Sequence, residues 1–455
     1  MLKTILLGII GLDIVVLVHE LGHFFAAKLS GIEVEAFSIG MGKKLLFFSY
    51  RSTEYRLSML PVGGYCKMKG EEQFSRALKE KDTSIPYEKG SLFSVSPFKR
   101  IFTYLAGPLA NFLFSVVVLS LIWLSGFSIN TYSNKIILVS DYPEVYHSTG
   151  NPADKGGLKS GDTIIRIEDS RVTNYSQIQD IVYQSPGKPL TFSVNREGKE
   201  IQLTITPALD KDSGAGKIGV APYIEPVIEN VKPASTSSIA GLKKGDRILE
   251  ANGEKVENYL DLLKVVAARP KLLKLKVLSG DIRMDRTLIP VYNDSGMTDL
   301  GISFRPLTIS KGRTGPVDSF KNGTLESVDN LMLTIKSLGL LFAGVHLDKA
   351  VSGPIRITYF VGEVATEGFK SGVKAGLTNL FRFLSVISIA LCFANLLPIP
   401  IFDGGLILFT LITIIRRKGV NPVTFYRYQS VGMFILLVIF LLTTFGDISF
   451  LFSRG

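Results

Sequence analysis

Three residues near the start of the chain have the types and the spacing for hydrolytic chemistry: His19, Glu20 and His23, in the run H-E-L-G-H. On a helix, positions i and i+4 share one face and lie about 6 Å apart along the axis, so both imidazoles can reach one Zn²⁺. Glu20 would then act as a general base toward the attacking water. The chain contains only 4 His, so this arrangement is improbable by chance. The alternative is two partly buried helix histidines beside a solvated glutamate.

This motif lies toward the end of an apolar segment, residues 4–29, that is long enough to cross a bilayer. The basic start of the chain resembles a signal peptide, but no small-residue cleavage site follows, and cleavage would remove the motif. We therefore expect an uncleaved span and hydrolysis within the membrane. Asp13 falls on the same helix face as Glu20, about 10 Å away. It either lines a wet entrance or lies solvated near the outer interface.

The composition excludes an ordinary soluble enzyme. Across 455 residues the mean hydropathy is +0.29 and 46% of the residues are hydrophobic, whereas 20% are charged. This mixture predicts membrane helices with at least one soluble insert, and the length predicts several domains. The net charge is +11, and residues 28–100 alone carry 13 Lys/Arg against 8 Asp/Glu. Such clustering is typical of membrane topology, so we expect no nucleic-acid partner.

Four apolar stretches are long enough to span a bilayer. They are residues 4–29, 101–127, 377–397 and 429–445. The positive-inside rule puts the basic connections, residues 28–100 and the stretch after Ile415, in the cytoplasm. The N-terminus, the long middle segment and the C-terminus then lie on the periplasmic side of a bacterial inner membrane. Cys66 and Cys392 fall in a basic connection and in a span, so no disulfide is expected.

A catalytic zinc site with two histidines lacks one protein ligand, because such sites keep the fourth position for water. Asp403 is the natural candidate, since a carboxylate at the edge of an apolar span is costly unless it is paired or metal-bound. Pro398 and Pro400 interrupt the helix just before it, and the backbone groups freed there must be satisfied in a cavity. The alternative is a turn at the membrane surface capped by Asp403.

Residues 33–70 are punctuated by glycine and alternate in polarity, which predicts a β-hairpin. One interpretation is a small cytoplasmic β-subdomain. The other is that an unpaired strand edge reaches the active site and binds the substrate backbone by strand addition, which would hold the substrate unwound from its helix.

The middle segment contains an internal repeat. The run G-L-K-S-G-D-T-I at residues 157–164 recurs as G-L-K-K-G-D-R-I at residues 241–248, a spacing of 84 residues. The pattern resembles PDZ domains and predicts two small β-rich domains that bind peptides or filter substrates by size; the alternative is a rigid spacer. After them, an apolar stripe at helical spacing predicts an amphipathic helix within residues 317–346, docked on the membrane or on the folded domains. The stripe consists of Val328, Leu331, Met332, Ile335, Leu338 and Phe342.

Taken with H-E-x-x-H, further motifs resemble the site-2 protease family of intramembrane zinc metalloproteases, in the branch with two PDZ domains that contains the regulators of sigma-E. These motifs are N-x-x-P-x-P-x-x-D-G at residues 395–404, A-G-P-L-A-N-F at residues 106–112 and F-S-I-G-M-G at residues 37–42. The resemblance covers essentially the whole chain. One departure is Phe402, where the family motif usually has Leu.

The resemblance implies one Zn²⁺ held by His19, His23 and Asp403, with Glu20 activating water. It also implies a set of substrate-binding residues: Asn111, Asn395, Pro398, Pro400, Gly40 and Gly42. The implied substrates are single-span membrane proteins of the anti-sigma-factor type and remnant signal peptides. An upstream site-1-type protease would first trim their external domain.

The expected fold class is a multi-domain membrane protein with a four-span α-helical core, a membrane-associated β-hairpin and two β-rich PDZ-like external domains. The expected segments are residues 1–32, 33–97, 98–127, 128–222, 223–309, 310–371, 372–415 and 416–455. Two other functions compete with proteolysis: a membrane-anchored PDZ scaffold with a silent zinc site, and a metal transporter. A scaffold has no use for the complete motif set, and the chain shows no inverted repeat of the transporter kind.

Overall fold

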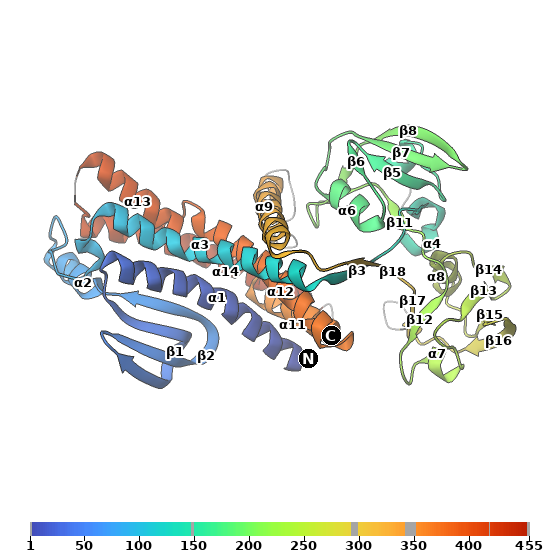
Figure 1. The fold of residues 1–455 in the computed structure, drawn as a ribbon, viewed down its shortest axis with the longest axis horizontal. Coiled ribbons are helices and arrows are strands. Elements are labelled where there is room, and N and C mark those ends of the chain that lie inside the picture. The colour runs from blue at the N-terminus through green and yellow to red at the C-terminus, as the bar shows by residue number, and fades with distance from the viewer. Residues whose placement is uncertain (1, 147–149, 293–298, 342–351, 418, 453–455) are drawn as a thin grey trace. The chain divides into compact units, whose positions relative to one another are not determined.

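The computed structural model describes residues 2–146, 150–292, 299–341, 352–417 and 419–452 (Figure 1). The chain separates into two compact units, one made of residues 1–127 and 311–455 and the other of residues 128–310. Among the described residues, the helices that could span a membrane all lie in the first unit. The second unit consists mainly of short strands.

The four predicted spans are present as long apolar helices. They are α1 (Leu2–Ser30), α3 (Pro97–Ser125), α12 (Val373–Leu396) and α14 (Pro422–Phe452). The same unit contains two further helices, α11 (Pro354–Lys370) and α13 (Asp403–Arg416). The sequence did not predict them as separate helices. The chain turns sharply between α12 and α13, where the two prolines of the predicted interruption lie.

Glycines allow α1 and α11 to pack closely. A Cβ on Gly8 of α1 would lie 1.9 Å from the carbonyl oxygen of Thr358, and a Cβ on Gly362 of α11 would lie 1.8 Å from that of Thr4. Helices in an apolar environment associate through van der Waals contact, which small residues permit. The backbones of α1 and α11 are therefore in direct contact at two levels.

A buried carboxylate attaches the last span to α11. Asp447 of α14 accepts hydrogen bonds of 2.9–3.1 Å from the backbone N–H groups of Gly353, Ile355 and Arg356. These groups lie at the start of α11, where a helix has no internal acceptor for them. Asp447 therefore caps α11 from another helix and holds the end of α14 against it.

The predicted hairpin consists of β1 (Val34–Tyr50) and β2 (Thr53–Met68), which lie beside α1 (Figure 1). Bulges divide both strands, so that residues 34–39 pair with residues 54–57 on one side and with residues 64–68 on the other. Residues 64–68 thus form an edge of the sheet. The Asp13 carboxylate accepts a hydrogen bond of 2.9 Å from the Gly63 backbone N–H, so it anchors the hairpin to α1. The chain continues through α2 (Glu71–Glu80) and a 3₁₀ turn, η1 (Leu92–Ser94).

The predicted amphipathic helix is present as α9 (Pro316–Leu341), and it packs on α3 and α12. The face of α9 that makes this contact consists of small and polar residues. A Cβ on Gly323 would lie 2.4 Å from the Ser120 hydroxyl. Glu326 accepts a hydrogen bond from the indole N–H of Trp123 and forms an ion pair with Arg382. The predicted apolar stripe is not core, because its central members Met332 and Ile335 are exposed. Phe342 lies outside the described residues.

The second unit contains two copies of one arrangement, repeat 1 (residues 136–222) and repeat 2 (residues 228–304). In each copy a four-stranded antiparallel sheet packs with one main helix, and the first and last strands pair with each other. The elements of repeat 1 are β4 (Ile136–Leu138), η2 (Val139–Asp141), α4 (Pro143–Tyr146), α5 (Pro152–Lys155), β5 (Thr163–Ile167), β6 (Ser170–Arg171), α6 (Tyr175–Tyr183), β7 (Leu190–Arg196), β8 (Lys199–Ile205), β9 (Ala208–Leu209), β10 (Gly216–Lys217) and β11 (Val220–Pro222). Those of repeat 2 are β12 (Ile228–Val231), α7 (Thr236–Ile239), β13 (Arg247–Ala251), β14 (Glu254–Lys255), α8 (Tyr259–Ala267), β15 (Leu273–Ser279), β16 (Ile282–Leu288) and β17 (Ile302–Phe304). Where the chain enters and leaves this unit, β3 (Phe127–Thr131) pairs with β18 (Leu307–Lys311).

The repeated Gly-Asp pair has the same structural role in both copies. Gly161 and Gly245 have φ of +94° and +93°, a conformation that favours glycine. Asp162 and Asp246 are buried, and each accepts a hydrogen bond of 2.9 Å from the backbone N–H three positions earlier. The motif therefore closes the turn that leads into the first long strand of each sheet.

We expect the change Gly362→Ala to lower the free energy of unfolding by about 1–3 kcal/mol, because the new methyl group would overlap a backbone carbonyl that cannot move aside. Gly339→Ala is the matched control: this helical glycine has open space around it, so the change should be neutral or stabilising by up to about 1 kcal/mol. Thermal unfolding of the detergent-purified variants measures both. Equal stability of the two variants would contradict the close packing of α1 on α11.

Candidate metal centre

The two motif histidines lie one turn apart on α1 and direct their Nε2 atoms toward each other, 3.1 Å apart. Both side chains are buried. His23 Nδ1 lies 2.8 Å from the Thr103 carbonyl oxygen of α3, so its N–H donates to that oxygen. This bond places the proton on Nδ1 and leaves the lone pair of Nε2 for another partner.

Asp403, the first residue of α13, completes a group of three donors that lie within 4.8 Å of one another. Its Oδ2 is 3.3 Å from His19 Nε2 and 3.4 Å from His23 Nε2. In a tetrahedral zinc site with bonds of about 2.0–2.1 Å, neighbouring ligand atoms are about 3.3–3.4 Å apart. The donor spacing therefore fits such a site with one position left for water.

Two glycines allow α1 and α3 to approach each other closely at the histidines. A Cβ on Gly107 of α3 would lie 2.4 Å from His23 Nε2 and 2.8 Å from Cε1 of His19. Gly22 of α1 faces α3 as well, and a Cβ there would lie 2.2 Å from the Ala106 carbonyl oxygen. Any side chain at position 107 would occupy the volume in which the two Nε2 atoms meet.

Asn111, on the same helix as Gly107, is fully buried against His19, with its amide Nδ2 3.3 Å from His19 Nδ1. Its Oδ1 has no hydrogen-bond partner among the described residues. Amide oxygen and nitrogen exchange places by a 180° rotation. In that orientation Oδ1 accepts from His19 Nδ1–H, which leaves His19 Nε2 free to bind a metal.

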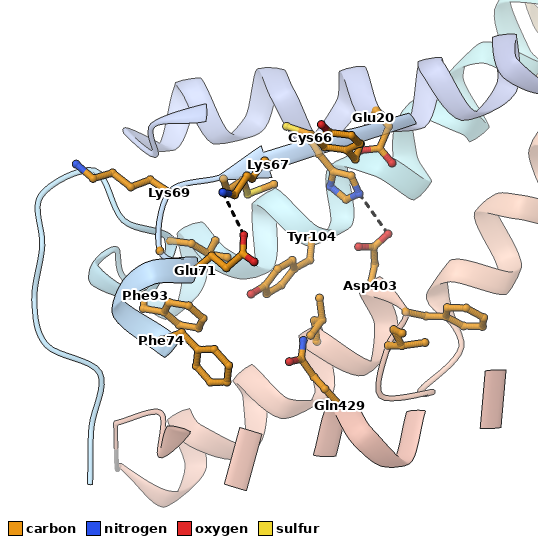
Figure 2. Close-up of a pocket in the computed structure, with 18 of the residues that line it drawn as sticks. Glu20, Cys66, Lys67, Lys69, Glu71, Phe74, Phe93, Tyr104, Asp403 and Gln429 are labelled. Atoms are coloured by element: carbon orange, nitrogen blue, oxygen red, sulfur yellow. Dashed lines mark ion pairs between the residues drawn. The ribbon is translucent and has the colours of Figure 1, made fainter. Parts of the chain in front are cut away.

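Glu20 and the donor group line one cavity of about 620 Å³ (Figure 2). Glu20 accepts a hydrogen bond from the backbone N–H of Cys66, in the edge segment 64–68 of β2. Farther along the cavity, Lys67 of this edge pairs with Glu71 of α2 at 3.3 Å, as the dashed line in Figure 2 shows. The edge of the hairpin is thus one wall of the cavity that contains the donors.

Comparison with known proteins identifies the family. The model of peptidase family M50 matches residues 7–439. The chain belongs to peptidase family M50. A protein of Treponema pallidum that is provisionally named a zinc metalloprotease is 41% identical over 450 residues, covering 98% of this chain and 99% of that protein. The regulator of sigma-E protease RseP of Escherichia coli is 28% identical over 464 residues, covering 97% of each chain.

Family membership, the zinc metalloprotease relatives and the donor group together imply zinc as the cofactor. Two imidazole nitrogens and one carboxylate oxygen are a donor set of catalytic zinc sites. The chain is therefore a zinc metalloprotease of the site-2 protease family with four candidate membrane spans, in agreement with the sequence-based identification.

The structure brings only some of the predicted substrate-binding residues to this M50 cavity. Asn395, near the end of α12, lines it, with Nδ2 3.5 Å from His19 Nε2. Asn111 lies behind His19 instead. Gly40, Gly42, Pro398 and Pro400 are not among the residues that line the cavity. Gly40 and Gly42 are left-handed positions within β1, and Pro400 packs against Gly432 of α14.

Several residues in and around the site were not predicted. Thr103 carried no sequence signal, and Gly107 was visible only as part of a motif. Four aromatic side chains line the cavity: Phe74 of α2, Phe93 of η1 and Tyr104 of α3, which Figure 2 labels, and Phe425 of α14. These four residues come from four separate elements, so no local pattern connects them.

Cys66 lines the same cavity as the zinc-binding group. Burial, reinforced by the nearby Glu20, raises the pKa of Cys66 to about 12. Cys66 is not one of the three donors that lie within 4.8 Å of one another. Cys66 and Cys392 are both free, as predicted.

We expect Gly107→Ala to abolish stoichiometric zinc binding while the protein stays folded, because the added methyl group would overlap His23 Nε2. Metal analysis of the purified variant, with thermal unfolding as the folding check, measures this. Gly339→Ala serves as the control with no effect on zinc content. Full zinc occupancy in the Gly107 variant would show that this glycine does not shape the centre.

Asn111→Leu should weaken zinc affinity by about 10–100-fold, because it removes the acceptor for His19 Nδ1–H. Asn111→Asp should lower the zinc affinity less, since a carboxylate can still accept the hydrogen bond from His19 Nδ1–H. Competition with a chromogenic chelator gives the affinities. Asn330→Leu on α9 is the control outside the site, and equal affinity of the two Asn111 variants would argue against an orienting role.

Proposed function

We propose that this M50 peptidase hydrolyses peptide bonds within the transmembrane segments of single-span membrane proteins. The observation that carries the proposal is the position of the donors. His19 and His23 lie on α1, a helix long and apolar enough to cross a membrane, and Asp403 follows the end of another such helix, α12. Chemistry at this group would take place at the depth of the bilayer, in a cavity bounded by protein.

In this proposal His19, His23 and Asp403 hold the zinc ion. When bound, zinc supplies Lewis acidity that polarises the scissile carbonyl and lowers the pKa of water. Glu20, on the same cavity wall, accepts the proton of the attacking water and delivers it to the leaving amine. The N–H of Cys66 holds the Glu20 carboxylate in place.

We propose that the substrate binds in an extended form along residues 64–68 of β2. This segment pairs with β1 on one side, and its residues 65–68 line the cavity. Strand addition to such an edge supplies backbone hydrogen bonds to an unwound peptide. Asn395 is placed to bind the substrate backbone. The predicted contributions of Gly40, Gly42, Pro398 and Pro400 would be indirect, through the shape of the hairpin and of the turn before Asp403.

The second unit would act before catalysis, as a pair of PDZ-like domains on the periplasmic side. We propose that it excludes substrates with large external domains, so that an upstream site-1-type protease must trim them first. Anti-sigma-factor-like proteins and remnant signal peptides meet these requirements. The orientation in the inner membrane is supported by the basic residues of segment 28–100, which the positive-inside rule places in the cytoplasm.

The test is cleavage of a tagged, pre-trimmed single-span substrate by the detergent-purified protein. Glu20→Gln should lower the rate by about 10²–10⁴-fold, because the general base is lost. It should leave the zinc content unchanged, since Glu20 is not one of the three donors. Mass spectrometry of the products locates the cleaved bond.

Glu144→Gln, an identical change at an exposed position of the second unit, is the matched control and should cleave like the wild type. Cleavage outside the membrane segment would contradict intramembrane proteolysis. Equal rates for wild type and Glu20→Gln would remove Glu20 as the base.

A further inference from the structure

The two faces of the β-hairpin differ in their partners. Residues that are in register on neighbouring strands point to the same face of a sheet. Phe37 is in register with Tyr55 and with Cys66, and the rings of Phe37 and Tyr55 both contact Phe24 of α1. This face therefore packs on α1, and the opposite face points away from that helix.

On the opposite face one arginine crosses the sheet. Ser38 of β1 is in register with Arg56 on one side and with Tyr65 on the other. Arg56 Nη1 donates a hydrogen bond of 2.7 Å to the Tyr65 hydroxyl, so the arginine side chain passes over Ser38 to the edge of the sheet. Ser38 is small and buried, and its hydroxyl is bonded to that of Ser58, so it leaves this path open.

A carboxylate holds the arginine from the other end. Arg56 Nε donates to Glu54 Oε1 at 2.6 Å, and Lys44 Nζ donates to the same oxygen at 2.8 Å. The guanidinium thus bonds Glu54 and Tyr65 through two separate nitrogens, a geometry that the single nitrogen of a lysine cannot reproduce. The four residues Lys44, Glu54, Arg56 and Tyr65 are here named the cross-sheet tie.

The cross-sheet tie ends at the cavity of the metal centre. Tyr65 lines this cavity, and so does the next residue, Cys66, whose backbone N–H holds Glu20. A tyrosine at the edge of a sheet can adopt several rotamers unless a partner selects one of them. The hydrogen bond from Arg56 therefore fixes an aromatic ring one residue away from the group that holds the general base.

The position of this ring matters for a substrate strand added along residues 64–68. Side chains directly opposite each other on adjacent strands have Cβ atoms about 4.5–5.5 Å apart, and aromatic residues pair favourably with aromatic and β-branched ones. Because Arg56 already donates to the Tyr65 hydroxyl, the ring presents its apolar surface to the opposite side chain. A cationic side chain there would also be repelled by the guanidinium.

We propose that the cross-sheet tie sets the specificity of substrate binding. Tyr65 selects a β-branched or aromatic side chain at one substrate position near the scissile bond, and Arg56 is a positioning residue that holds the ring of Tyr65 in place. This inference rests on the proposed function, because it requires a substrate strand along residues 64–68.

Binding to protein that does not cleave tests the selection. A fluorescently labelled, pre-trimmed single-span substrate is titrated against full-length Glu20→Gln protein in detergent. The residues on both sides of the cleaved bond are replaced one at a time by valine, alanine or lysine. We expect one position at which alanine raises the Kd about 2–5-fold relative to valine, and at which lysine raises it further. Tyr65→Ala should bring the alanine-to-valine ratio of Kd values at that position to one.

A double-mutant cycle tests the role of Arg56. Arg56→Met alone should lower the same ratio toward one and leave the other substrate positions unchanged. In the Tyr65→Ala background Arg56→Met should have no further effect, because the arginine acts only through the tyrosine. Arg51→Met is the matched control: Arg51 lies in the hairpin turn, exposed and stacked on Tyr50, so its loss should leave the ratio as in the parent protein. Zinc content and thermal unfolding check that the variants are intact.

Three results would overturn the inference: the same Kd ratio at every substrate position, an unchanged ratio in Arg56→Met, or a further loss when Arg56→Met is added to Tyr65→Ala. Cleavage by protein that retains Glu20 is measured in parallel, and the selected position should change KM rather than kcat. Normal cleavage without a selected position would refute only this inference. The expected binding pattern without cleavage would refute only the proposed function, and an absence of binding would refute both.

Discussion

The contact between two imidazoles and one carboxylate among membrane helices is the interaction on which the rest of this structure depends. A carboxylate in such an environment is costly unless it is paired or binds a metal. The Oδ2 atom of Asp403 lies 3.3–3.4 Å from both histidine Nε2 atoms, so the carboxylate is paired with the two imidazoles. The contact requires α13 to begin beside α1. The turn after α12 and the glycines of α3 provide the space for it.

The same requirement explains how the surrounding elements are attached. Thr103 and Asn111 of α3 contact the outer nitrogens of the two imidazoles, so α3 sets the orientation of both rings. The hairpin is held to α1 by Asp13, and its edge holds Glu20 through a backbone N–H. Both imidazoles and Asp13 thus contact polar groups on a different element.

The second unit shows how two copies of one fold can diverge. Both repeats keep the buried aspartate and the left-handed glycine of the turn before the first sheet, because the turn geometry requires them. They differ on one side of the main helix, where repeat 2 has the fully buried Leu260, packed against Ile137 and Val139 of repeat 1, at the position of the half-buried Ser176. A position outside the core of the repeat can change its partner without affecting that core.

The sequence by itself determined the features that depend on local periodicity. The four spans, the i and i+4 histidines, the hairpin, the amphipathic helix and the 84-residue repeat all have a signal within a short window, and all are present. Asp403 was chosen for its chemistry, although it lies 380 positions after His23. Only the tertiary structure decided that Asn111 lies behind His19, that residues 65–68 rather than Gly40 and Gly42 line the cavity, and that α9 buries its polar face. These outcomes depend on packing between elements distant in the chain, and no local pattern encodes which surfaces meet.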